Sequence, residues 1–285
     1  MKETSEISAL FTLLDDPDKE VFSTVGEKIV SFGRPILPNL ENLWETTPDE
    51  EVQKRVQLLI GRLHFRNLQD ELAAWNLEPE KDLLTGTLLV SRLVHPELSL
   101  EPVRHSAEKI RQSIWLELNN YLTPLETTNV ISTVLYNFHG LKGMEALYTD
   151  PDNFLVNKLL ETKKGSAASL GTFYLSICEM LNIPIRAINI PNQFILAYFN
   201  ESLLESPAEE ILFFIDPLGG QIYTYEDVEA YFRRASLELT ASCLQPMRHT
   251  DIIQFQLNEL AKCYSGPYEK EKQEQAVQLS HVLSR

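Results

Sequence analysis

The stretch Lys164-Gly165-Ser166-Ala167-Ala168-Ser169-Leu170 decides the fold, because it opens an apolar segment that ends at Leu181-Asn182-Ile183-Pro184. Apolar residues recur within this segment at the spacing of a helix that is buried on most sides. The pattern therefore predicts one buried helix over 166–181, whose apolar positions are Leu170, Phe173, Tyr174, Ile177 and Leu181.

Short apolar runs of strand length follow the predicted helix. They cover 185–190, 194–199 and 211–215, and proline, asparagine and glycine bound them. Gly219-Gly220 predicts a hairpin turn that returns the chain through 221–223, and Thr224 is expected to cap the next helix. The second half of the chain is thus predicted to pack one helix on a small antiparallel sheet.

The N-terminal third carries repeated helix-start signals. Asp16-Pro17 and Thr47-Pro48 each place a capping side chain before a proline, and Glu50 stands in capping-box register with Thr47. Pro48 follows Pro17 by 31 positions, a period typical of stacked helix-pair repeats. Two such units are predicted, and their apolar spacing resembles that of HEAT-like repeats.

The first unit is predicted to pair a helix over 21–32 with one over 35–44. The second is predicted to run over 51–63 and onward through 68–75. Two copies are fewer than the three that usually make a stable solenoid, so we expect this region to lean on another part of the molecule.

Three more helices are predicted between Glu80 and Phe138, with prolines at 96, 102 and 124 as their boundaries. Thr123 and Glu126 form a second capping box, and His139-Gly140 ends the last of these helices. His139 is a candidate catalytic group. A histidine in the last turn that satisfies helix carbonyls is the commoner case, and it is the interpretation that we favour.

The tail is predicted to form two helices, over 251–264 and 268–283, in a hairpin like one tetratricopeptide-type unit. The fold class is therefore α+β. Its regions are a helical repeat-like part (1–78), a core with its preceding helices (79–245) and a helical tail (246–285).

Composition and charge argue against several classes of function. The formal net charge of −16 opposes binding to nucleic acid, because the surface would repel phosphates. No apolar segment approaches the roughly 18 residues that span a membrane, and the start lacks a signal peptide, so a cytoplasmic protein is expected. Three cysteines and six histidines are scattered without metal-ligand spacing, so we expect reduced thiols, no metal site and no cofactor.

The segment 150–234 resembles a bacterial transglutaminase-like family. The shared motifs are, in order, 151–161, Lys164-Gly165, Ile183-Pro184, 190–194 and Phe214-Ile215-Asp216-Pro217. That family joins a degenerate thiol-protease-like core to a helical N-terminus and a short tetratricopeptide-like tail. The resemblance covers roughly 200 residues and implies the same architecture here.

Active transglutaminase-like enzymes use a Cys-His-Asp triad, with the thiol at a helix N-terminus. The resemblance puts the thiol position on Ala167, 17 positions before Pro184, the histidine position on Gln193 and the carboxylate on Asp216. Alanine has no nucleophile, and a glutamine amide accepts no proton at neutral pH. We therefore expect no catalytic residue.

Other residues near these positions are cleft candidates: Ser166, Ser169 and Asn192. A shift of the alignment by one or two residues would bring either serine to the helix start, and such a serine would need a base, for which His249 would have to fold back from the tail. Both serines are also ordinary helix caps, and Asp216 suits a turn after a strand.

Two functional hypotheses follow. The first is an inactive transglutaminase-like scaffold that binds an unidentified protein or peptide. The second is a hydrolase or acyl transferase that uses a non-standard serine or cysteine.

Overall fold

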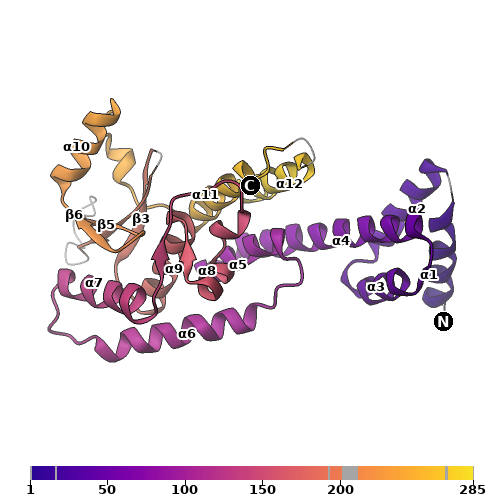
Figure 1. Cartoon of the computed structure of the whole chain (residues 1–285), viewed down its shortest axis with the longest axis horizontal. Coiled ribbons are helices and arrows are strands. Elements are labelled where there is room, and N and C mark those ends of the chain that lie inside the picture. The colour runs from indigo at the N-terminus through magenta and orange to yellow at the C-terminus, as the bar shows by residue number, and fades with distance from the viewer. Residues whose placement is uncertain (1, 17, 192, 201–210, 267–268, 285) are drawn as a thin grey trace. The chain divides into compact units, whose positions relative to one another are not determined.

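The computed structural model describes residues 2–16, 18–191, 193–200, 211–266 and 269–284. The chain divides into two compact units, residues 1–71 and 72–285. We call them the N-terminal unit and the core unit, and Figure 1 labels their helices and strands.

The N-terminal unit is helical. It contains α1 (Lys2–Thr12), α2 (Lys19–Ser31), α3 (Leu37–Thr46) and most of α4 (Glu50–Leu77). The residues of its buried core come from the short turn after α1 and from α2, α3 with the turn before it, and α4. They are Leu14, Val25, Ile29, Ile36, Leu37, Leu40, Val52, Val56, Leu59 and Leu63. The second predicted unit is one unbroken helix, α4, with no turn between its two halves.

The predicted caps of α2 and α4 are wrong by two residues. Asp18 caps α2, since its Oδ1 accepts from Glu20 N at 2.8 Å. Asp49 Oδ1 likewise accepts from Glu51 N at 2.7 Å, so Asp49 takes the place predicted for Thr47. Each helix begins two residues after its proline, where an aspartate carboxylate stands directly before the first free backbone N–H groups. Pro17 lies outside the described residues.

After the last turns of α4, the core unit contains the three predicted helices, α5 (Leu83–Val94), α6 (Leu100–Glu117) and α7 (Pro124–Ser132). The capping box of Thr123 and Glu126 is confirmed. Pro102 does not bound a helix, because it lies in the first turn of α6. The chain leaves α7 as a π-helix, η3 (Thr133–Phe138), which periodicity did not predict.

The buried helix is α9 (Ala167–Met180), and the residues of its middle turns are all buried. It follows η4 (Pro151–Phe154), α8 (Val156–Thr162) and a small parallel pair, β1 (Lys142–Gly143) with β2 (Lys164–Gly165). The sheet that α9 contacts is antiparallel, in the order β3 (Ile185–Ile190), β4 (Gln193–Phe199), β5 (Ile211–Asp216) and β6 (Gln221–Tyr223). The prediction of one helix on a small antiparallel sheet is confirmed.

The two faces of this sheet pack on different helices. Phe194 lies against Gly171 of α9, whereas Ala197 and Phe199 lie in a cluster with Val228 and Phe232 of α10 (Tyr225–Ala235). Thr224 caps α10 as predicted. Both faces of β4 are therefore buried.

The tail forms the predicted helical hairpin, α11 (His249–Lys262) and α12 (Lys270–Leu283). α11 also packs on α5 and α9, so the tail belongs to the core unit. Among the described residues, no helix combines the length and the apolar character needed to cross a membrane.

Candidate functional site

The start of α9 is held by Ser166. This N-cap residue is 1% exposed, and its Oγ accepts from the backbone N of Ser169 at 3.5 Å. Its own N–H donates to the carbonyl of Asn153 at 3.0 Å. The interpretation of Ser166 as a cap is confirmed.

Ser169 is buried beneath this first turn. Its Oγ donates to the carbonyl of Asn153 at 2.9 Å and lies 3.2 Å from the carbonyl of Ser166. A Cβ at Gly165 would come within 2.5 Å of the same oxygen, which explains the glycine at that position. The hydroxyl is 0% exposed and hydrogen-bonded to the backbone, which is the environment of a structural serine.

The turn after β5 closes one side of the site. Asp216 Oδ1 accepts from Leu218 N at 2.8 Å, and Gly220 N donates to the Asp216 carbonyl. Leu218 in turn accepts a hydrogen bond from Gly143 N of β1 at 3.1 Å. The side chain of Asp216 thus holds the hairpin turn that the sequence predicted there.

The backbones of the three positions implied by the resemblance converge near Gly171. Ala167 lies one helical turn before Gly171, and a Cβ at Gly171 would come within 2.5 Å of Phe194 and 3.2 Å of Pro217. Gln193 and Asp216 directly precede these two contact residues. The start of β4, the end of β5 and the start of α9 therefore meet in one neighbourhood.

The pleat of β4 separates the side chains within this neighbourhood. Gln193 pairs with Ile190, which lies in the cluster under α10, and Gln193 is exposed. Leu196 pairs with Ile215, so the next residue of β5, Asp216, shares the α10 face. Phe194, and not Gln193, faces α9. Asn192 lies outside the described residues.

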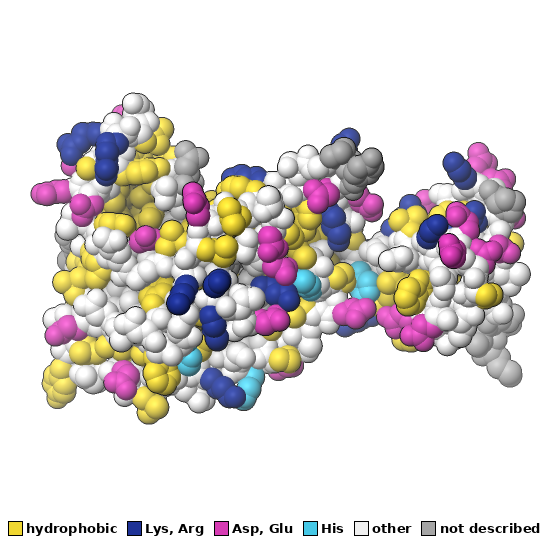
Figure 2. Space-filling view, in the orientation of Figure 1, with side chains coloured by type: hydrophobic (Ala, Val, Ile, Leu, Met, Phe, Trp, Pro, Cys, Tyr) yellow, Lys and Arg dark blue, Asp and Glu magenta, His cyan; other side chains and the backbone are white. Residues whose placement is uncertain are grey.

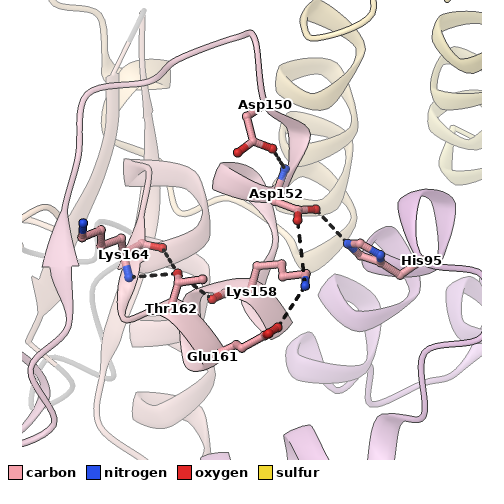
Figure 3. Close-up of polar contacts among 7 residues, drawn as sticks. All are labelled: His95, Asp150, Asp152, Lys158, Glu161, Thr162 and Lys164. Carbon is pink, nitrogen blue, oxygen red and sulfur yellow. Dashed lines mark hydrogen bonds and ion pairs between the residues drawn. The ribbon is translucent and has the colours of Figure 1, made fainter.

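A polar cluster that sequence reasoning missed braces this site (Figure 3). His95 Nε2, at the end of α5, lies 2.7 Å from Asp152 Oδ1, and Lys158 Nζ lies 3.9 Å from Asp152 Oδ2 and 3.0 Å from Glu161 Oε2. Asp152 belongs to η4, which also carries the Asn153 carbonyl that binds Ser166 and Ser169. The cluster fixes η4 on α5 and so positions the start of α9.

His139, the other histidine considered, ends η3. Its backbone N–H donates to the Val134 carbonyl at 2.8 Å. Burial and, to a lesser extent, the charge of Lys163 lower the pKa of its imidazole, and its Nε2 is buried without a partner among the described residues. A neutral imidazole at this helix end is consistent with a structural role.

The opposite end of α9 opens on a cavity of about 1300 Å³. There His249 Nε2 lies 2.6 Å from Glu179 Oε1, while Glu179 Oε2 accepts from Leu83 N at 3.3 Å. Ten residues of helix separate Ser169 from Glu179, which corresponds to about 15 Å. His249 is therefore too far from Ser169 to act as its base, and the folding back considered for the serine hypothesis does not occur.

Two of the cysteines are also unsuited to nucleophilic chemistry. Burial raises the pKa of the Cys178 thiol well above its ordinary value, and burial raises the pKa of Cys263 to about 11. All three cysteines are free thiols, and Cys243 is half-buried. Thiols of raised pKa hold little thiolate at neutral pH.

A model of the transglutaminase-like superfamily matches residues 101–258, which is more than half of the chain and includes α7, α9 and the whole four-stranded sheet. The chain belongs to the transglutaminase-like superfamily. No solved structure matches it.

Bacterial proteins are among the relatives of this chain. A UPF0162 protein of Vibrio cholerae is 25% identical over 150 residues, which are 53% of each chain. The protein SirB1 of Salmonella typhimurium is 24% identical over 204 residues, or 70% of this chain and 72% of SirB1. The UPF0162 protein YchA of Escherichia coli is 22% identical over the same shares. The chain thus spans about half the length of the Vibrio relative and 72% of the length of SirB1 and of YchA.

A cysteine placed at the helix start should report the electrostatics of the site. We expect the thiol of Ala167→Cys to have a lowered pKa, because it lies at the N-terminus of a 14-residue helix, three residues after Lys164. The matched control is Ala235→Cys, at the last residue of α10. The pH dependence of alkylation, followed by peptide mass mapping, should give a midpoint about one unit lower at 167 than at 235. Equal midpoints would contradict this view of the site.

The His249–Glu179 pair should make stability depend on pH. The hydrogen bond to Glu179, opposed by burial, raises the pKa of His249 overall. The pair therefore stabilises the fold fully below the unfolded pKa of about 6.5, and this contribution is lost as pH rises through the folded-state value. In urea unfolding, His249→Gln should be most destabilising at acidic pH and least at alkaline pH. The exposed His105→Gln is the control, and a pH-independent loss in His249→Gln would refute the linkage.

Proposed function

We propose that this chain is a catalytically inactive transglutaminase-like protein that binds a protein or peptide segment. The observation that carries the proposal is the first turn of α9. This turn begins with Ala167, whose methyl group carries no nucleophile, and the hydroxyls of Ser166 and Ser169 are hydrogen-bonded to the backbone. A helix start without a nucleophile can hold a ligand but cannot form a covalent intermediate.

The surroundings favour a binding role with an acidic ligand. Lys142 and Lys164 are directly paired across β1 and β2, and Lys163 lies beside them. None of the three ammonium groups forms an ion pair with a residue of the described ranges, although the chain carries 41 acidic side chains. Like charges opposite one another in a strand pair are destabilising, and an acidic segment would relieve this repulsion. Lys and Arg side chains gather in Figure 2 over the region where Figure 1 draws α8 and α9.

The test is an affinity capture from bacterial lysate with three baits. These are the wild type, Ala167→Trp, which fills the half-buried helix start, and Ala235→Trp, the same change at the exposed end of α10. We expect a partner that is held by the wild type and by Ala235→Trp but is lost from Ala167→Trp. Thermal melts establish that all three baits are equally folded. A partner retained by Ala167→Trp would move the binding function away from this site.

Charge should decide the affinity of that partner. Lys164→Glu is expected to weaken capture, because it replaces an attraction to an acidic segment by a repulsion. Lys54→Glu, on the exposed surface of α4, is the control for the change in net charge. Equal capture by Lys164→Glu and the wild type would overturn the acidic character of the proposed ligand.

A further inference from the structure

A groove of about 510 Å³ lies between α6 and the helix formed by α7 and η3, on the surface of the core unit. Its lining comes from both helices: Ser113, Leu116, Glu117, Asn129, Val130, Thr133, Val134 and Phe138. Leu116 is 73% exposed and Phe138 is 75% exposed. Hydrophobic side chains also gather in Figure 2 along the lower left margin, where Figure 1 draws α6 and α7.

The π-helix creates part of this groove. Tyr136 is turned inward, where its Oη donates to the Pro217 carbonyl at 2.6 Å. Within the same six residues Phe138 is turned outward, where its ring is not buried by the rest of the core unit. A π-turn is an energetically unfavourable insertion that is often found at functional sites. A large aromatic side chain at the rim of an apolar groove indicates an interaction surface.

The charges on α6 indicate which partner fits. Lys109, Ser113 and Glu117 are spaced four residues apart, so they lie along one face of α6, with the small serine midway. Neither Lys109 nor Glu117 forms an ion pair within the described ranges, whereas Arg111 of the same helix pairs with Glu108 at 2.7 Å. If a second α6 packs antiparallel across Ser113, Lys109 of each copy faces Glu117 of the other. The face is self-complementary under a two-fold axis.

We propose that this chain forms a two-fold homodimer through the groove, with the α6 helices antiparallel and crossing at Ser113. Leu116 and Phe138 of each copy fill the apolar part of the interface, and the Lys109–Glu117 pair occurs twice at its rim. Ser113 permits the close approach of the two helices. The dimer is independent of the proposed binding function at the start of α9, and it goes beyond it.

The dimer is tested with the full-length protein by sedimentation over a concentration series. We expect the wild type to dimerise and Leu116→Asp to raise the dissociation constant by about 100-fold or more, because two carboxylates would be buried in each interface. Leu77→Asp is the matched control, since Leu77 is 84% exposed and lies outside the groove. A wild type that stays monomeric throughout would overturn the proposal.

Charge exchange tests the two-fold geometry itself. Lys109→Glu and Glu117→Lys should each raise the dissociation constant, because each places like charges together twice. A one-to-one mixture of these two variants should recover a heterodimer, and the double exchange in one chain should recover the homodimer. A dimer that ignores the single changes, or that the exchange does not rescue, uses another surface and refutes the proposal.

Discussion

Replacement of Trp75 by alanine is expected to lower the free energy of unfolding by about 3–5 kcal/mol. Trp75 is 1% exposed and is among the largest fully buried side chains of the core unit. Its ring fills the space beside Gly86, where a Cβ would come within 2.6 Å of the indole. Its Nε1 donates to the Asp82 carbonyl at 2.9 Å, just before α5 begins. The variant loses this packing and the indole hydrogen bond, and the Asp82 carbonyl keeps its bond from Gly86 N at 3.2 Å.

The matched control for this change is Trp115→Ala. Trp115 is 61% exposed on α6, so the same deletion should alter the free energy of unfolding by no more than about 0.5 kcal/mol. Urea unfolding followed by circular dichroism measures both variants without depending on tryptophan fluorescence. Similar losses in the two variants would mean that the last turns of α4 do not pack as described.

Local sequence patterns are enough to predict many of the helix starts and turns of the core unit. The sequence predicts Thr123 and Thr224 as helix caps and favours a capping or packing role for Ser166 or Ser169; Thr123, Thr224 and Ser166 each make a capping hydrogen bond. Gly220 was predicted in a turn, and its φ of 73° is one that favours glycine. These features depend on interactions that span only a few residues, so they can be predicted from a short stretch of sequence.

Contacts between distant residues were not predictable in the same way. His95 and Asp152 are 57 positions apart, and Glu179 meets His249 only because α9 and α11 pack together. The sequence also does not predict on which face of the sheet the Gln193 side chain lies. Leu196 and Ala197, neighbours on β4, are both 0% exposed, so the strand shows no alternation of apolar and polar residues that would fix its faces.

The contact between α9 and the sheet should be intolerant of any side chain at Gly171. We expect Gly171→Val to lower the free energy of unfolding by about 3 kcal/mol, because its Cβ would lie within 2.5 Å of the Phe194 ring. The ring cannot easily move, since it stacks on Phe255 of α11 at a centroid distance of 5.0 Å. The added methyl groups would also meet Pro217, whose carbonyl holds Tyr136.

Gly61→Val separates this steric effect from the intrinsic effect of the substitution. Gly61 lies within α4, and a Cβ there would meet nothing within 4 Å. Valine has a slightly better helix propensity than glycine, so Gly61→Val should be neutral or should stabilise the protein by roughly a few tenths of a kcal/mol. Hydrogen exchange would assign each change to its own helix. Opposite signs at the two positions would establish that Gly171 is a packing requirement of the core, and equal effects would show that α9 does not approach the start of β4 closely.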